Sequence, residues 1–275
     1  MSTTPLHGQR IAITGAGRGI GLATAKELHQ RGATVVIGDL DTKAASAAAA
    51  AIGPDVQAFA LDVSDHASFA AFVERATADA PLDVLINNAG IMPIGHFLEQ
   101  SAEVHRRAVQ VNVMGCVYGM HLALPAMIER GSGHIINIAS AAGKSPVPGG
   151  LTYCGTKSAV IALTETARVE FSGSGVEFTC VMPSFTNTEL IAGTTATKLV
   201  PIAEPADVAR AIAGAVVKPK ADVFVPKIVG ALLTPQPLMG RRLRDIVNRK
   251  LGVYNTFLDF DPDARAAYTR RITES

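Results

Sequence analysis

Short apolar segments alternate with helical segments from residue 9 to residue 226, and this alternation constrains the fold more than any other feature. Apolar runs predict strands at 9–14, 34–38, 56–61, 83–87, 134–140, 175–182 and 221–226. Helical patterns fill the intervals, so each strand must return parallel to the one before it. A chain of 275 residues with 48% hydrophobic content can bury one large core. The sequence therefore predicts an α/β fold with one doubly wound parallel sheet of about seven strands, covered by helices on both faces.

A glycine-rich turn joins the first strand to the first helix. It reads Gly15-Ala-Gly17-Arg-Gly19-Ile-Gly21, and Ile20 occupies the position where the strict G-x-G-x-x-G pattern has its last glycine. Such a turn lets the backbone approach a pyrophosphate, and the helix N-terminus adds N–H donors and a positive dipole. The next strand ends at Asp39, whose carboxylate would bind the adenosine ribose hydroxyls and repel a 2′-phosphate. The alternative for Asp39 is a solvated turn shared with Asp41.

Polar residues follow the next two strands. Asp62-Val63 lies where it can touch an adenine, although Asp62 could instead cap the helix that begins near Ser64. The tetrad Asn87-Asn88-Ala89-Gly90 ends the fourth strand, and its amides could tie neighbouring loops together rather than take part in chemistry.

Four residues carry candidate catalytic chemistry. Tyr153 and Lys157 lie one helical turn apart, and the lysine charge would favour the phenolate form of Tyr153. Ser140 ends the fifth strand, where its hydroxyl can hold a substrate oxygen. Asn112 lies inside an apolar helix, which predicts either a buried amide bonded to backbone or a kink whose freed carbonyl holds a water. Taken alone, a Tyr-x-x-x-Lys pair is common in helices of no catalytic role.

Taken together and in this order, these motifs resemble the short-chain dehydrogenase/reductase family over about residues 8–226. The motifs are Thr14–Gly21, Asn87–Gly90, Asn112, Ser140, Tyr153-x-x-x-Lys157, and Pro183 with Thr186 and Thr188. The resemblance implies a Rossmann fold in residues 1–226, binding NAD(H) or NADP(H). Residues 227–275 extend past this common core, and we expect a helical extension packed on or beside it. The resemblance also implies that Tyr153 is the general acid/base and that Lys157 lowers its pKa and holds the nicotinamide ribose. Ser140 would orient the substrate oxygen, and Asn112 would position a proton-relay water.

The coenzyme contacts implied by the resemblance extend around the same sheet edge. They are Gly15, Arg18, Gly19, Ile20, Gly21, Asp39, Asp62, Val63, Asn88, Ala89, Gly90, Tyr153, Lys157, Pro183, Thr186 and Thr188. Thr188 matches the threonine that contacts the nicotinamide amide. Two departures from the family pattern stand out. Ser184 replaces the usual glycine after Pro183, and Arg18 resembles a basic residue of NADP-preferring members. We expect NAD, with NADP as the alternative.

The resemblance implies an NAD(P)-dependent oxidoreductase that interconverts an alcohol and its carbonyl. The Tyr–Lys spacing argues against the enoyl reductases of this family. The alternatives are an NADP-dependent ketoacyl or carbonyl reductase, and a non-catalytic dinucleotide-binding regulator, which the four filled catalytic positions disfavour. Loops expected at the pocket carry Ile91, Met92, Ile94, Val147, Leu151, Phe185, Leu190 and Ile191, with Lys144 and Glu189 as the few charges. These predict a steroid-, retinoid- or lipid-like substrate, unless the residues are ordinary loop packing.

Composition limits the remaining possibilities. The net charge of +1 gives no field that would attract nucleic acid, and the seven histidines have no metal-type spacing. Cys116, Cys154 and Cys180 have no paired spacing, which fits a cytoplasmic location. The N-terminal residues lack a signal-peptide pattern, and we expect no apolar run of membrane-spanning length. A homodimer or homotetramer is expected.

The segment 237–252 is basic and amphipathic. It contains one acid, Asp245, and five basic residues: Arg241, Arg242, Arg244, Arg249 and Lys250. Its apolar residues recur at helical spacing; they are Leu238, Met239, Leu243, Ile246, Val247 and Leu251. Such a helix can lie on an anionic membrane surface. Packing of the apolar stripe on the chain's own sheet or on a partner subunit is the favoured expectation.

Overall fold

A computed structural model of the chain describes residues 5–194, 201–236, 239–250, 252, 254 and 256–274. Its centre is a seven-stranded sheet in the order β3-β2-β1-β4-β5-β6-β7, and every neighbouring pair is parallel. The strands are β1 (Arg10–Thr14), β2 (Thr34–Asp39), β3 (Gln57–Ala60), β4 (Val84–Asn87), β5 (Gly133–Ile138), β6 (Val176–Pro183) and β7 (Asp222–Val225). The predicted doubly wound sheet is confirmed.

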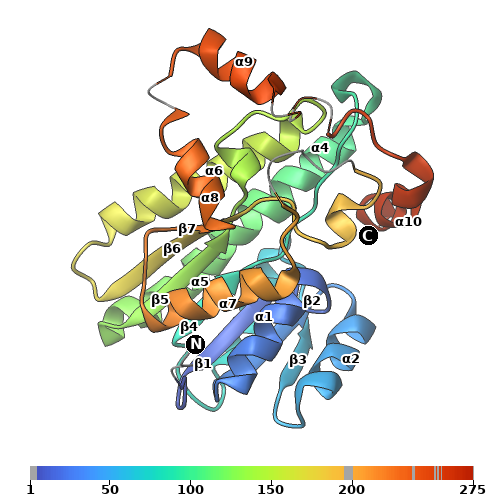
Figure 1. The fold of residues 1–275 in the computed structure, drawn as a ribbon. Coiled ribbons are helices and arrows are strands. Elements are labelled where there is room, and N and C mark those ends of the chain that lie inside the picture. Colours follow the sequence, from blue (N-terminus) through green and yellow to red (C-terminus); the bar gives the residue numbers. More distant parts are fainter. Residues whose placement is uncertain are drawn as a thin grey trace.

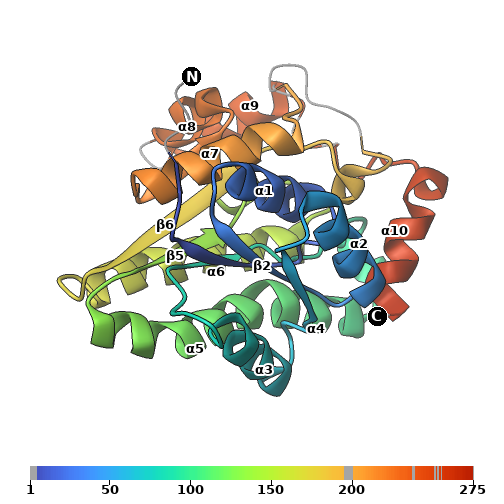
Figure 2. The ribbon, with the colours of Figure 1, turned by 90° about the horizontal axis from the view of Figure 1, so that it is seen from below.

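Helices cover both faces of this sheet, so the molecule has three layers (Figure 2). One face carries α1 (Gly19–Gln30), α2 (Thr42–Ile52) and α7 (Pro205–Val217), and the other carries α3 (His66–Ala76), α5 (Gly115–Arg130) and α6 (Leu151–Glu170). Alternate residues of β1 enter the two layers: Ile11 and Ile13 pack toward α1, whereas Ala12 packs toward α3 and α5. Burial on both faces explains why the strands are continuous apolar runs.

The strand order reverses between β1 and β4, because β2 and β3 lie on one side of β1 and the later strands lie on the other. In open α/β sheets the loops at such a switch point diverge and leave a crevice at the carboxyl ends of the strands. The glycine-rich turn after β1 and the tetrad after β4 therefore meet at the edge where a ligand can enter.

A continuous helix runs from Ala102 to Arg130 and includes α4 (Ala102–Val109), a π-helical turn (Gln110–Met114) and α5. By length and composition alone this helix could cross a membrane, although Gln110, Asn112 and His121 interrupt its apolar run. It is half buried, and Ala123, Leu124 and Met127 belong to the core beneath the sheet. These contacts are those of a core helix.

Three helices follow β7: α8 (Lys227–Leu233), α9 (Arg241–Lys250) and α10 (Pro262–Glu274). In Figure 1, α9 projects at the top of the molecule and α10 lies at the right, near the chain end. The apolar stripe predicted for 237–252 does not pack on the chain's own sheet at Leu243 and Ile246, each of which is 53% exposed. Leu238, Leu251 and the side chain of Val247 lie outside the described residues. Among the described side chains of α9, Asn248 is buried, and it donates to Ser145 Oγ at 3.3 Å.

Candidate active site

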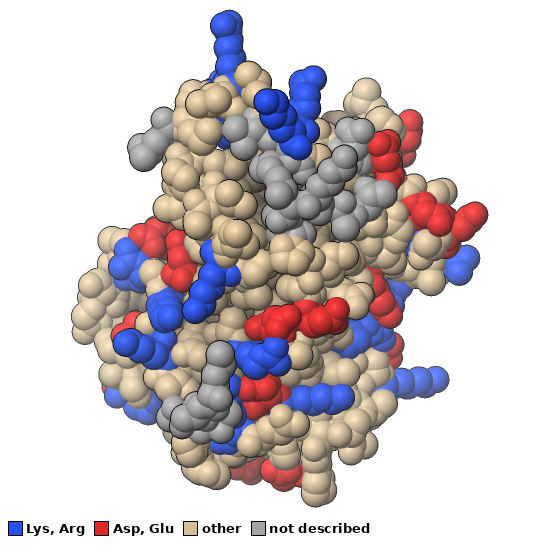
Figure 3. Space-filling view, in the orientation of Figure 1, with Lys and Arg blue, Asp and Glu red and all other residues tan. Residues whose placement is uncertain are grey.

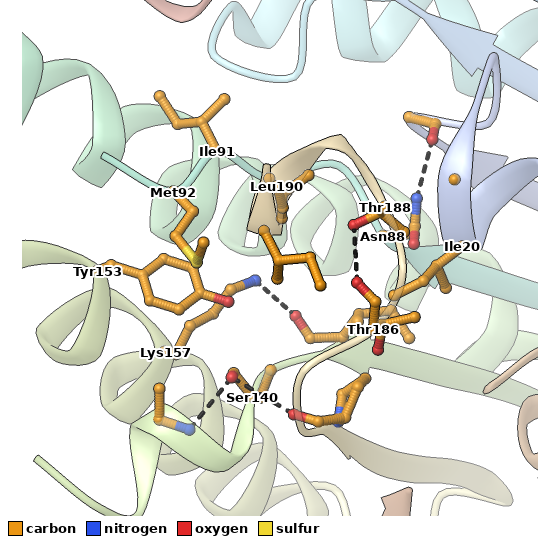
Figure 4. A pocket seen from close by; sticks show the side chains of 18 of the residues that line it. Ile20, Asn88, Ile91, Met92, Ser140, Tyr153, Lys157, Thr186, Thr188 and Leu190 are labelled. Atoms are coloured by element: carbon orange, nitrogen blue, oxygen red, sulfur yellow. Dashed lines mark hydrogen bonds between the residues drawn. The ribbon is translucent and has the colours of Figure 1, made fainter. Parts of the chain in front are cut away.

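A cavity of about 960 Å³ opens at the carboxyl ends of the strands, and the predicted site residues gather around it. Figure 4 shows Tyr153, Lys157 and Ser140 on one side and Asn88, Thr186 and Thr188 on the other, with Leu190 between them and Met92 beside the Tyr153 ring. The predicted residues that line it are Gly15, Arg18, Gly19, Ile20, Asp39, Asp62, Val63, Asn88, Ala89, Gly90, Ser140, Tyr153, Lys157, Pro183, Thr186 and Thr188. Gly21 and Asn112 do not line it; both are buried behind its wall.

Side chain to backbone hydrogen bonds hold the loops after β1 and β4 together. Asn88 Nδ2 donates to the carbonyls of Thr14 at 2.8 Å and Gly15 at 2.9 Å. In return, the N–H groups of Asn88 and Ala89 both donate to Thr14 Oγ1 at 3.0 Å. The tetrad thus ties neighbouring loops, as its amides allowed, and it also lines the cavity.

The glycines of the turn have different roles. Gly15 has φ +64°, and a Cβ there would lie 2.7 Å from Ala89 Cα, so both its backbone conformation and its close approach require glycine. A Cβ at Gly21 would lie 2.4 Å from the Gly15 carbonyl oxygen. Gly21 therefore lets α1 pack against the turn, and it supports the cavity without forming its surface.

Asp39 lies at the end of β2 and faces the turn. Its carboxylate accepts hydrogen bonds from the N–H of Gly17 at 2.8 Å and of Asp41 at 3.0 Å. Asp41 has separate partners: it caps α2 by accepting from Ala44 N–H at 3.0 Å, and it forms an ion pair with Arg18 at 2.5 Å. The Ala44 bond and then the Arg18 bond lower the pKa of Asp41. Asp41 thus has a structural role in the turn before α2, and the guanidinium of Arg18 is engaged in an ion pair with it.

Asp62 also lines the cavity and does not cap α3. Its Oδ1 accepts from Ser64 N at 2.9 Å and from Ser64 Oγ at 2.6 Å, which closes a turn two residues long. The helix begins later, at His66, and Asp65 caps it by accepting from Ala67 N at 3.0 Å. The capping alternative for Asp62 is therefore wrong, and adenine contact stays a prediction.

Tyr153 lies in the first turn of α6, opposite the end of β5 where Ser140 follows Ile138. Burial raises the pKa of Tyr153 above its ordinary range, and a hydrogen bond with the Ser140 hydroxyl opposes that rise. Ser140 Oγ also contacts the Pro183 carbonyl at 3.4 Å and accepts from Ala142 N–H at 3.1 Å, so neighbouring loops fix its position.

Lys157 is buried, and its ammonium donates to the Ile138 carbonyl at 2.8 Å. The Nζ atom lies 6.0 Å from the centroid of the Tyr153 ring. Burial lowers the pKa of Lys157. Stabilisation of the Tyr153 phenolate by the lysine charge stays a prediction.

Asn112 lies in the π-helical turn and is 0% exposed. Its Oδ1 accepts from Ile91 N–H at 2.8 Å, and its Nδ2 donates to the Ile91 carbonyl at 2.9 Å and to Thr156 Oγ1 at 3.0 Å. Asn112 is thus a buried amide bonded to backbone, the first of the two alternatives, and it fixes the loop after β4. The predicted helix irregularity is present at the same residue; a water-relay role stays a prediction.

The loop after β6 forms the wall beside Ser140. Thr188 Oγ1 contacts the Thr186 carbonyl at 3.3 Å, and both threonines line the cavity. Ser184, which replaces the glycine usual in related chains, donates its N–H to the Val225 carbonyl at 2.8 Å. Its hydroxyl is buried without a hydrogen-bond partner among the described residues.

The rest of the wall is mainly apolar. Of the predicted substrate residues, Ile91, Met92, Val147, Phe185, Leu190, Ile191 and Glu189 line the cavity. Ile94, Leu151 and Lys144 do not: Leu151 is exposed, and Lys144 lies 3.8 Å from Asp222. The sequence interpretation missed lining residues of the C-terminal segment, among them Leu232 in α8, Phe257 between α9 and α10, and Tyr268 and Ile272 in α10. Their local pattern carries no motif that could have identified them.

The cavity fits a dinucleotide at its glycine end. The turn presents backbone without side chains at Gly15 and Gly19, and a Cβ at Gly17 would lie 2.9 Å from Asp39 Oδ2. The glycine turn with the N-terminus of α1 would hold the pyrophosphate, and Asp39 a ribose hydroxyl. Lys157 and Tyr153 lie at the other end, where a nicotinamide ribose would reach.

Comparisons with known proteins agree with this geometry. Residues 9–199 match the short chain dehydrogenase family. The chain is 37% identical over 189 residues to the probable oxidoreductase EphD of Mycobacterium tuberculosis, covering 67% of this chain but only 32% of that protein. It is 30% identical over 249 residues to 17-beta-hydroxysteroid dehydrogenase 13 of Rattus norvegicus, covering 88% of this chain and 83% of that protein.

A solved structure shares the fold. A short chain dehydrogenase/reductase from Burkholderia phymatum in complex with NAD matches with a TM-score of 0.76 and 26% identity, over 85% of this chain and 94% of that chain. The predicted family, enzyme class and coenzyme class are confirmed. The chain belongs to the short-chain dehydrogenase/reductase family of NAD(P)-dependent oxidoreductases.

Proposed function

We propose that this protein interconverts a hydrophobic secondary or primary alcohol and its carbonyl, with NAD as the preferred coenzyme and Tyr153 as general acid/base. The observation that carries the proposal is that Tyr153, Ser140 and Lys157 converge on one end of an apolar cavity whose other end is the glycine turn. The similarity to a protein named as a hydroxysteroid dehydrogenase supports a hydrophobic substrate for this chain.

The proposed chemistry moves one proton and one hydride. In alcohol oxidation, the hydroxyl proton passes to the phenolate oxygen of Tyr153, and the carbon–oxygen single bond becomes a carbonyl. A nicotinamide coenzyme, whose ribose Lys157 would hold, would supply the acceptor for the hydride from the same carbon. Ser140 holds the substrate oxygen beside Tyr153, and the buried ammonium of Lys157 supplies positive charge near the developing alkoxide. In reduction, Tyr153 returns the proton.

NAD is preferred because of how the charges near β2 are arranged. Asp39 lines the cavity and keeps its carboxylate toward the glycine turn, where it would repel a 2′-phosphate. Arg18, the one feature that suggested NADP, is already paired with Asp41 at 2.5 Å. A guanidinium held in this pair is less available to a phosphate.

The function is tested by measuring coenzyme reduction with NAD and NADP separately over a panel of alcohols, including steroid, retinoid and long-chain alcohols, with a β-ketoacyl thioester for the reverse direction. Tyr153→Phe should lower kcat by about 10²–10⁴-fold, as expected for loss of a general acid/base, while NADH affinity by calorimetry stays nearly unchanged. A variant that keeps substantial activity would remove Tyr153 from the mechanism. Activity confined to the thioester would replace the proposal with a ketoacyl reductase, and a wild-type protein that binds NADH but turns over nothing would favour a regulator.

We further propose a cytoplasmic homodimer or homotetramer that touches anionic membranes through α9. Figure 3 shows Lys and Arg side chains projecting at the top of the molecule, where α9 lies. Arg241, Arg242, Arg249 and Lys250 are exposed beside Leu243 and Ile246, and Asp245 accepts from the Tyr254 hydroxyl at 3.0 Å. Exposed apolar side chains flanked by cations suit an anionic lipid surface.

Vesicle sedimentation tests this contact. The wild-type protein should sediment with vesicles containing phosphatidylserine and not with neutral phosphatidylcholine vesicles, and Leu243→Glu with Ile246→Glu should abolish sedimentation. The matched control is the exposed pair Leu98→Glu with Val169→Glu, which lies on other elements and should leave it unchanged. Absence of vesicle binding together with a smaller assembly in the double variant, measured by light scattering, would assign the face to a subunit interface.

A further inference from the structure

We propose that the Tyr268 hydroxyl is a second hydrogen-bond donor to the substrate, so that the substrate is a hydrophobic alcohol or ketone carrying a further oxygen acceptor remote from the reacting carbon. This inference rests on the proposed function and names a feature of its substrate. No family motif includes this residue, because it lies in α10, beyond the matched region at 9–199.

Tyr268 reaches the substrate end of the cavity. Its side chain is buried and lines the same cavity as Tyr153. Met92, Leu190 and Ile272 line the wall near it, and all three are apolar. A phenol among apolar side chains is a polar contact at a defined place in the cavity.

The phenol oxygen has one fixed partner and one free donor. The Met92 N–H donates to Tyr268 Oη at 2.8 Å, which uses one acceptor site of the oxygen. Among the described residues, no group accepts the Tyr268 proton. A buried hydroxyl normally satisfies its hydrogen-bonding capacity, so a donor facing a cavity is suited to a ligand acceptor.

Two arginines hold the ring in place. The guanidinium carbon of Arg265 lies 4.7 Å from the Tyr268 ring centroid, and that of Arg271 lies 5.4 Å from it. Arg265 is 2% exposed and donates to the carbonyls of Leu190 and Met92, both at 2.6 Å, whereas Arg271 is paired with Glu189. Burial raises the pKa of Tyr268, so the phenol stays protonated at neutral pH and can donate.

The chemistry defines the ligand group. A neutral phenol donates to a carbonyl, ether, ester or hydroxyl oxygen, and a substrate that reaches both Tyr153 and Tyr268 needs an apolar skeleton between two oxygens. Substrates without the second oxygen would leave the Tyr268 donor unpaired in a dry cavity, and such loss is costly to binding.

The test compares two secondary alcohols on one fused-ring skeleton, of which only one carries a ketone on the ring remote from the hydroxyl. On the wild-type protein, kcat/KM for the keto alcohol should exceed that for the deoxy alcohol by about tenfold or more, the effect of one buried hydrogen bond. Tyr268→Phe should remove most of that preference and leave kcat/KM for the deoxy alcohol within about threefold. Tyr254→Phe, outside the cavity, is the matched control and should keep the preference.

The outcomes separate this inference from the proposed function. If the wild-type protein does not distinguish the two alcohols, or if Tyr268→Phe lowers kcat/KM equally for both, the donor role is overturned and Tyr268 only supports the loop through Met92. If neither alcohol is oxidised, the proposed function fails for this substrate class. The donor role is then decided by calorimetric titration of the two compounds into the NADH-bound wild-type protein, where equal affinities would overturn it.

Discussion

The two ends of the cavity are built differently. The coenzyme end is assembled from short motifs directly after β1, β2 and β4, and its loops are tied by Thr14 and Asn88 across two adjacent strands. The substrate end is closed by α10, which is distant in sequence from every loop it holds. Arg265 bonds both the loop after β4, through Met92, and the loop after β6, through Leu190 and Ala192. Coenzyme binding and substrate selection are therefore separable in this molecule.

Among these variants, we expect Arg265→Met to give the largest difference between its effect on alcohol binding and its effect on coenzyme binding. Methionine supplies an unbranched side chain but leaves three carbonyls without the arginine donor, one of them buried and two partly buried. The loss of a donor to a buried acceptor costs about 1–3 kcal/mol. We expect KM for the alcohol to rise about 100-fold, while the NADH dissociation constant by calorimetry changes less than about threefold. Arg265→Lys should restore part of the loss. The exposed Arg270→Met on the same helix is the control, and equal weakening of coenzyme and substrate would break the comparison.

Asp39→Asn tests the coenzyme end. The variant keeps an acceptor for the Gly17 N–H but removes the charge that repels a 2′-phosphate. The ratio of kcat/KM with NAD to that with NADP should fall by about 10–100-fold, and the alcohol KM should stay constant. Asp65→Asn, which alters a cap outside the cavity, should leave the ratio unchanged. A wild-type preference for NADP would refute the argument from Asp39.

Two glycines with positive φ, Gly15 at the coenzyme end and Gly193 at the substrate end, allow the same substitution to be compared at both ends. A Cβ at Gly15 would lie 2.7 Å from Ala89 Cα, and one at Gly193 would lie 2.4 Å from the Asp261 carbonyl oxygen at the start of α10. Each alanine variant should cost about 1–3 kcal/mol in strain. Gly15→Ala should weaken NADH binding about tenfold, whereas Gly193→Ala should raise the alcohol KM by a similar factor. Identical effects on both constants would show that the two ends are coupled.

Ser140→Ala probes the point where the two ends meet, and its effect should be the smallest. Alcohol oxidation needs the Tyr153 phenolate, so its rate should rise with pH between about pH 6 and pH 9, below the raised pKa. The Ser140 bond lowers that pKa, so its removal should move the profile to higher pH. A fall in kcat with an unchanged profile would limit Ser140 to holding the substrate oxygen.

The sequence predicted the coenzyme end well because its residues follow strands directly, and the carboxyl ends of parallel strands meet. Asp39 was identified from its position after β2, and Asn88 from its position after β4 together with the family resemblance; both line the cavity. The sequence could not predict the substrate end, since the acceptors of Arg265 are backbone carbonyls, which every residue has. Packing of the α9 apolar stripe on the chain's own sheet was not predicted correctly for a related reason. Helical spacing identifies an apolar face of a helix but not what covers that face.

The contacts of α10 with the loops it holds are largely to backbone atoms. Arg265 bonds carbonyls, Tyr268 accepts from the Met92 N–H, and the Asp261 N–H donates to the Gly193 carbonyl at 2.8 Å. These bonds do not depend on the side chains of the loop residues. We therefore expect substitutions at Leu190 and Ile191 to leave α10 in place over the substrate end of the cavity. A library at these two positions would therefore sample new substrate shapes on an unchanged frame, which is how one fold can acquire many specificities through few substitutions.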